Sequence, residues 1–160
     1  MRKGGETDTD RIEKTILLRV PRARVWRALT DPAQFGAWFG AKMPAGSFAP
    51  GKTARAAITH PGYEHLTLEI TIEKMEPERL FSWRWHPHAV DTERDYSKDP
   101  TTLVVFTLEE AEGGTRLTVV ESGFDKVPSA YRATAFRSNR DGWAEQLKNL
   151  ERHVTANPAT

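Results

Sequence analysis

The chain has 160 residues, with 23 basic and 22 acidic side chains, a formal net charge of +1 and no cysteine. This length allows one domain with a substantial core. The balanced charge predicts neither a nucleic-acid surface nor an anionic-membrane surface, and the lack of cysteine excludes disulfides and thiolate chemistry. No apolar run approaches the roughly 18 residues of a membrane span. The polar start has no apolar secretion signal, so a cytoplasmic location is expected.

The first part of the chain predicts a strand followed by two short helices. Residues 1–10 offer nothing to bury and are expected to be a disordered tail, followed by a single domain over 11–155 and a flexible end over 156–160. Residues 11–20 favour a strand that ends at Pro21. One short helix is expected around Val25 to Leu29. A second begins near Asp31 and ends at Gly40, which is typical of a helix C-terminus.

From residue 46 onward, apolar residues alternate with a period of two, which predicts antiparallel strands. These strands are expected over 52–60, 66–72, 81–85, 104–108 and 117–121. Turns are predicted at Pro61-Gly62 and Gly113-Gly114. The polar segment 86–100 is the longest loop, and it is expected either to be solvated or to act as a lid.

A long helix is predicted from Pro128 to Val154. Trp143, Leu147, Leu150 and Val154 follow one another at helical spacing and form an apolar stripe. Such a stripe requires a large apolar surface, which the strands would supply. The order of elements therefore predicts an α+β fold in which a curved antiparallel sheet of about six to seven strands wraps around one long C-terminal helix.

Several short motifs occur in a fixed order: residues 25–32 (VWRALTDP), 38–40 (WFG), 114–118 (GTRLT), 121–124 (ESGF) and 142–150 (GWAEQLKNL). Together they resemble the SRPBCC superfamily (START-like, helix-grip), and more narrowly its branch related to the C-terminal domain of the heat-shock-protein-90 ATPase activator. The resemblance covers about residues 11–155. It implies a helix-grip fold with a cavity between sheet and helix, which relatives use for lipids, sterols, polyketides or aromatic substrates. It brings no catalytic signature.

Side-chain alternation on the strands indicates which residues face the long helix, where they either fill a core or line a cavity. Two polar residues, His60 and Glu121, share this inward parity. They are expected either to lie at a solvent-exposed rim or to point inward, where they could orient a ligand or act as an acid/base pair. Arg140 could pair with Glu121 or with an anionic ligand group. The predicted ligand-binding residues are Trp38, Phe39, Met43, Phe48, Ile58, His60, Ile70, Trp83, Trp85, Phe106, Glu121, Phe136 and Arg140.

The sequence gives little support for a metal site, a catalytic serine or a phosphate-binding loop. His86, His88 and Asp91 lie close together in the polar loop, but no further spaced ligands accompany them, so no metal site is predicted. The sequence has no serine in a nucleophile-elbow context and no glycine-rich phosphate loop. No cofactor is predicted.

We therefore expect a protein that binds a small, mostly hydrophobic or aromatic molecule, and we favour a binding protein over an enzyme. Two other classes stay open. One is a co-chaperone-like module that contacts a chaperone through an exposed apolar patch. The other is a cyclase- or dehydratase-type enzyme with His60 or Glu121 as general base. The edges of an open sheet would also allow a homodimer.

Overall fold

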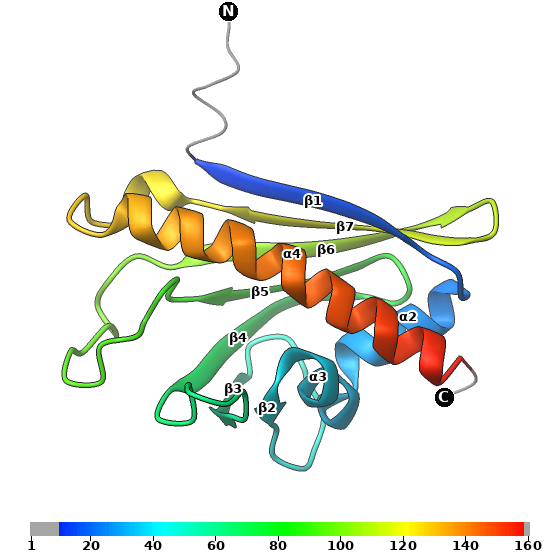
Figure 1. Cartoon of the computed structure of the whole chain (residues 1–160), viewed down its shortest axis with the longest axis horizontal. Helices are drawn as coiled ribbons and strands as arrows, with labels where there is room; N and C mark the ends of the chain where they lie inside the picture. Colours follow the sequence, from blue (N-terminus) through cyan, green and yellow to red (C-terminus); the bar gives the residue numbers. More distant parts are fainter. Residues whose placement is uncertain (1–9, 159–160) are drawn as a thin grey trace, which may run out of the picture.

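A computed structural model describes residues 10–158 of the chain. Within these residues, seven strands form one antiparallel sheet in the order β1-β7-β6-β5-β4-β3-β2 (Figure 1). The strands are β1 (Arg11–Leu18), β2 (Ala41–Lys42), β3 (Thr53–Ile58), β4 (Thr67–Glu76), β5 (Leu80–Trp85), β6 (Thr102–Ala111) and β7 (Gly114–Ser122). The helices are α2 (Arg22–Thr30), α3 (Pro32–Phe39), the short 3-10 helix η1 (Phe124–Lys126) and α4 (Arg132–Ala156). The α+β helix-grip prediction is confirmed.

The long helix α4 lies across one face of the sheet (Figure 1). Its apolar stripe of Trp143, Leu147, Leu150 and Val154 is buried, as the spacing predicted. The helix begins at Arg132 rather than at residue 128, because residues 128–131 form a separate turn. No helix in the described part of the chain is both long and apolar enough to cross a bilayer.

The two short helices are joined at Asp31, which ends α2 and begins α3. Its side chain accepts a hydrogen bond from the backbone nitrogen of Gln34 at 3.1 Å, and so caps α3. The helix ends at Gly40, whose φ of 94° is a left-handed conformation that glycine adopts without strain. Across the pair, Trp38 Nε1 donates to the carbonyl oxygen of Ala28 at 2.8 Å. Both helices are therefore confirmed.

The predicted strands are present, but several have other bounds: β1 and β3 end two residues earlier than expected, at Leu18 and Ile58. Strand β2 was not predicted, because its two residues are too few to show a period of two, yet Ala41 pairs with Ile58 of β3. Strand β4 runs on to Glu76 with a bulge between Ile72 and Lys74, which increases the bend of the sheet. The inward-facing residues that form the centre of the core are Leu68, Ile70, Phe81, Trp83, Val104, Phe106, Leu117 and Val119.

The chain ends are described only in part. Asp10 accepts hydrogen bonds from the backbone nitrogens of Phe124 and Asp125, at 3.2 and 3.1 Å. The remainder of the expected tail, residues 1–9, lies outside the described residues. At the other end, Ala156 is the last residue of α4, and residues 159–160 are outside the described range.

Candidate functional site

A carboxylate is buried in the middle of the protein, at the end of β7. Glu121 continues the inward parity of Leu117 and Val119, and it pairs with Ile12 of β1 and Val104 of β6. Its exposed fraction is 0%. The inward alternative of the sequence analysis is therefore the one that the structure shows for Glu121.

Four side chains donate hydrogen bonds to this carboxylate. Trp85 Nε1 of β5 and Thr102 Oγ1 of β6 donate to Oε2 at 2.7 and 2.6 Å. Trp143 Nε1 of α4 donates to Oε1 at 2.9 Å. Asn139 Nδ2, one helical turn before Trp143, lies 3.1 Å from both oxygens. Both oxygens of Glu121 are therefore occupied as acceptors.

Two opposing effects act on the protonation of Glu121. Burial raises the pKa of its carboxyl group, and the hydrogen bonds from Thr102, Trp85, Trp143 and Asn139 act in the opposite direction because they stabilise the charged form. The effect of burial is the larger one, so the pKa lies above its usual value. None of the ion pairs found among residues 10–158 involves this carboxylate.

A cavity of about 580 Å³ lies beside this group. Its walls come from the end of α3, from β3, β4, the end of β5, the N-terminal half of α4 and the loop 86–101, which we call the cavity loop. The volume falls within the range of small-molecule sites, about 300–1,000 Å³. Its apolar wall is formed by Phe39, Ile58, Leu66, Leu68 and Trp85, and its polar wall includes Arg55, His65, Glu69, His86, His88, Asp91, Arg94, Asp95, Tyr96 and Asn139.

Trp85 and Asn139 connect the cavity to the buried carboxylate. Both residues line the cavity, and both donate to Glu121. Glu121 itself does not line the cavity. The carboxylate therefore lies behind the wall and fixes the orientation of two side chains that line the cavity.

The cavity loop is tied to the start of α4 through Asp99. Asp99 Oδ2 accepts from Arg94 Nη2 at 2.6 Å and from the hydroxyl of Tyr131 at 2.9 Å. The Arg94 guanidinium also lies over the rings of Tyr96 and Tyr131, at 5.0 and 5.5 Å from their centroids. The hydrogen bond from Arg94 lowers the pKa of Asp99. Burial, together with the bond to Asp99, raises the pKa of Tyr131 to about 12.

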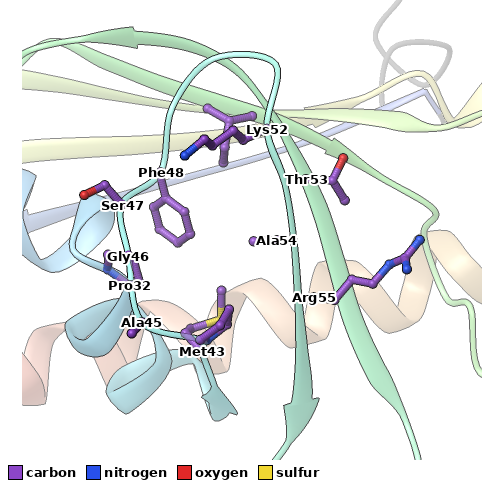
Figure 2. A pocket seen from close by; sticks show the side chains of 12 residues that line it. Pro32, Met43, Ala45, Gly46, Ser47, Phe48, Lys52, Thr53, Ala54 and Arg55 are labelled. Atoms are coloured by element: carbon purple, nitrogen blue, oxygen red, sulfur yellow. The ribbon is translucent and has the colours of Figure 1, made fainter.

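A second, smaller hollow lies beside β3. Figure 2 shows Phe48, Met43 and Ala54 around it, with Lys52 at its rim. Its volume is about 190 Å³, which is below the usual range for a small-molecule site. The larger cavity is therefore the better candidate site.

The structure distributes the predicted site residues over several environments. Phe39, Ile58 and Trp85 line the large cavity, and Met43 and Phe48 line the small hollow. The buried core holds Trp38, Ile70, Trp83 and Phe106, and Phe136 is half-buried with its ring 5.2 Å from that of Phe124. A role of these residues in binding stays a prediction.

Two predicted polar residues lie away from the carboxylate. The side chain of His60 is exposed and its ring lies 5.4 Å from that of Tyr63, so His60 lies at the surface, two residues beyond the end of β3. Arg140 is exposed and contacts Asp141 Oδ1 at 3.4 Å. The considered pairing of Arg140 with Glu121 is not formed, and Asn139 contacts the carboxylate instead.

Asn139 and Thr102 were not predicted as site residues from the sequence. Asn139 lies four residues before Trp143 and eight before Leu147, so a polar residue on the apolar stripe of α4 was the available signal. His86, His88 and Asp91 do line the cavity. Among residues 10–158, however, no group of three or more histidine, aspartate or glutamate side chains is arranged to hold a metal ion.

Comparisons with known proteins agree with this architecture. The family model described as "Activator of Hsp90 ATPase homolog 1-like protein" matches residues 19–155. A comparison with curated proteins finds no match.

Solved structures of low sequence identity share the fold. The protein MLL2253 from Mesorhizobium loti is 24% identical, with a TM-score of 0.71 over 92% of this chain and 98% of its own. The protein NE0264 from Nitrosomonas europaea is 19% identical, with a TM-score of 0.72 over 95% and 98% of the two chains. DynU16, a putative protein in the dynemicin biosynthetic locus, is 23% identical, with a TM-score of 0.69 over 91% of this chain but only 47% of its own.

Proposed function

The chain belongs to the family of Activator of Hsp90 ATPase homolog 1-like proteins, and on this basis we propose that it binds a small, largely apolar or aromatic molecule. The ligand occupies the cavity between β3, β4, the end of β5, α4 and the cavity loop. The function rests on binding rather than on catalysis.

The observation that carries this proposal is the composition of the cavity. A space of about 580 Å³ has an apolar wall that includes the rings of Phe39 and Trp85, with the amide of Asn139 beside them. Small-molecule sites typically combine such an apolar wall with a few oriented polar groups. Here the indole of Trp85 and the amide of Asn139 are held in place by Glu121. The cavity is thus preorganised for a flat apolar ligand.

A second candidate function is proton-transfer chemistry of the cyclase type, favoured by the buried carboxyl group of raised pKa. The likeness to DynU16 from a biosynthetic locus fits such a role. However, a general base must reach the proton that it removes, within about 2.6–3.2 Å or through one water. Glu121 lies behind Trp85 and Asn139, and His60 is exposed. We therefore prefer binding.

The co-chaperone alternative finds no support in the surface of the described residues. The exposed large apolar side chains are Leu17, Tyr63 and Val90, which come from β1, the β3–β4 connection and the cavity loop. They do not belong to one element that could dock on a partner.

Calorimetric titration with fatty acids, sterols, flavonoids and small bicyclic aromatics tests the proposal. We expect saturable binding of one class, and a loss of at least tenfold in affinity in Ile58→Asp, because a carboxylate would enter the apolar wall. Ala57→Asp is the matched control, since Ala57 is exposed and adjacent on the same strand. Failure of every class to bind, or equal effects of both substitutions, would contradict the proposal.

A further inference from the structure

The amide nitrogen of Asn139 faces its neighbour Glu121, which is the orientation that an ionised carboxylate requires. An ionised carboxylate has acceptor oxygens and no donor, and Asn139 lies 3.1 Å from both oxygens of Glu121. If the amide were flipped, its carbonyl oxygen would face two carboxylate oxygens without a proton between them. The nitrogen Nδ2 faces the ionised Glu121, in agreement with these contacts, and the carbonyl oxygen Oδ1 faces away from it.

The carbonyl oxygen of Asn139 is left free for another donor. The hydrogen bonds of the Asn139 side chain within the described residues both run from Nδ2 to Glu121. No described residue therefore donates to Oδ1. It is also not among the enclosed unpaired polar atoms, which in the described residues are Arg24 Nη2 and Trp83 Nε1. Since Asn139 lines the cavity, the cavity wall presents an accessible acceptor here.

The neighbouring donor on this wall is already used. The indole N–H of Trp85 would be the natural partner of a ligand carbonyl or ether oxygen, but it donates to Glu121 at 2.7 Å. The cavity is thus lined by the rings of Trp85 and Phe39, which are inclined by 61° with centroids 6.1 Å apart, and by the amide of Asn139. A ligand group beside Asn139 leaves a polar atom unpaired unless that group is a donor.

We propose that the ligand carries a hydrogen-bond donor on its aromatic or apolar frame, in the manner of a phenol, and that this donor binds Asn139 Oδ1. Asn139 is then a specificity-determining residue, and Glu121 is a positioning residue that acts through it. This inference rests on the proposed function, because it assigns a chemical class to the ligand of the same cavity.

Three matched probes test this inference: naphthalene, 2-naphthol and 2-methoxynaphthalene. They share the bicyclic frame, and only 2-naphthol has a donor. In the wild-type protein we expect 2-naphthol to bind about three- to tenfold more tightly than its methyl ether, which is the effect of one net hydrogen bond. In Asn139→Leu the two should bind within about twofold of each other, and the affinity for naphthalene should be kept or increased.

Ser138→Leu is the matched control, because Ser138 is the preceding, exposed residue on the same helix. It should retain the preference for 2-naphthol. If none of the probes binds to the wild-type protein, the proposed function fails for this ligand class. If all three bind with equal affinity, or if Asn139→Leu keeps the preference, this inference fails while the proposed function stands.

Thermal unfolding of the variants accompanies the titrations. If Asn139→Leu does not fold, Asn139→Ser provides the second test, because a shorter side chain withdraws the acceptor without adding apolar volume. A retained preference for 2-naphthol in that variant would overturn the inference.

Discussion

The indole nitrogen of Trp143 lies 2.9 Å from Oε1 of Glu121, so the middle of α4 is hydrogen-bonded to the end of β7 through the core. Both residues are buried. A hydrogen bond between enclosed groups cannot be replaced by water when one partner is removed. The bond therefore fixes which turn of α4 lies over β7, and with it the position of Asn139 one turn earlier.

Replacement of Trp143 by phenylalanine should lower the free energy of unfolding by about 2–4 kcal/mol, because it removes a donor to a buried carboxylate and leaves a small void. Urea titration measures this loss. Trp26→Phe is the control, since Trp26 is half-buried on α2 and its N–H has no hydrogen-bond partner among the described residues. Equal losses in the free energy of unfolding of the two variants would show that the effect comes from ring volume and not from the hydrogen bond.

The raised pKa of Glu121 gives its contribution to stability an unusual dependence on pH. A carboxyl group whose pKa is higher in the folded protein binds its proton more tightly there. Its contribution to stability is therefore fully present below the pKa of the unfolded chain and is lost as the pH rises through the raised folded value. Most paired surface carboxylates behave in the opposite way.

Glu121→Gln tests this dependence, because glutamine carries no titratable proton. Trp85, Thr102, Asn139 and Trp143, which face Glu121, do not titrate in this range. We expect the stability advantage of the wild-type protein over the variant to grow as the pH falls from 8 toward the ordinary glutamate value of 4.5. Urea titrations of both proteins across this range measure it, and an advantage that shrinks on acidification would contradict the assigned shift.

Asp99→Asn should loosen the cavity loop, because the neutral amide replaces the acceptor for Arg94 and Tyr131. The side chain of Arg94 is 42% exposed, so the expected loss of global stability is small. Amide hydrogen exchange in residues 86–101 should become about two- to fivefold faster. Glu93→Gln, an exposed substitution in the same loop, should leave the exchange rates unchanged.

Two glycines in helices should respond in opposite ways to alanine. A Cβ at Gly142 in α4 would meet no atom within 4 Å, so Gly142→Ala should stabilise the protein by about 0.5–1 kcal/mol. A Cβ at Gly36 in α3 would collide with the backbone oxygen of Ala41, so Gly36→Ala should destabilise it by more than about 2 kcal/mol. A melting temperature that rises for Gly142→Ala and falls for Gly36→Ala would support both predictions.

Most of the fold could be predicted from local patterns. The stripe from Trp143 to Val154 and the alternation in β4 to β7 are properties of neighbouring residues, so they are readable in the sequence. The two-residue strand β2 carries no period. The bulge between Ile72 and Lys74 shifts the inward face by one residue to Met75, and one apolar residue out of step does not distinguish a bulge from the end of a strand.

The site could be predicted only in part, because its contacts join distant segments. Glu121 is 36 residues from Trp85 and 22 from Trp143. Parity placed Glu121 on the inner face but could not show that two indoles would meet it. Likewise, parity could not separate Trp83, enclosed in the core, from Trp85, which lies at the end of the same strand and lines the cavity.

The pairing of β1 with β7 has a consequence for how the protein folds during synthesis. Thr15 and Thr118 face one another across this pair, 103 positions apart in the chain. Strand β1 leaves the ribosome before the other six strands, and its partner β7 is the last of the seven to be made. Contacts of such high sequence separation slow folding, so the nascent chain must keep its first strand unpaired until β7 emerges. Because β7 is the last strand to be synthesised, its pairing with β1 completes the sheet on which α4 packs.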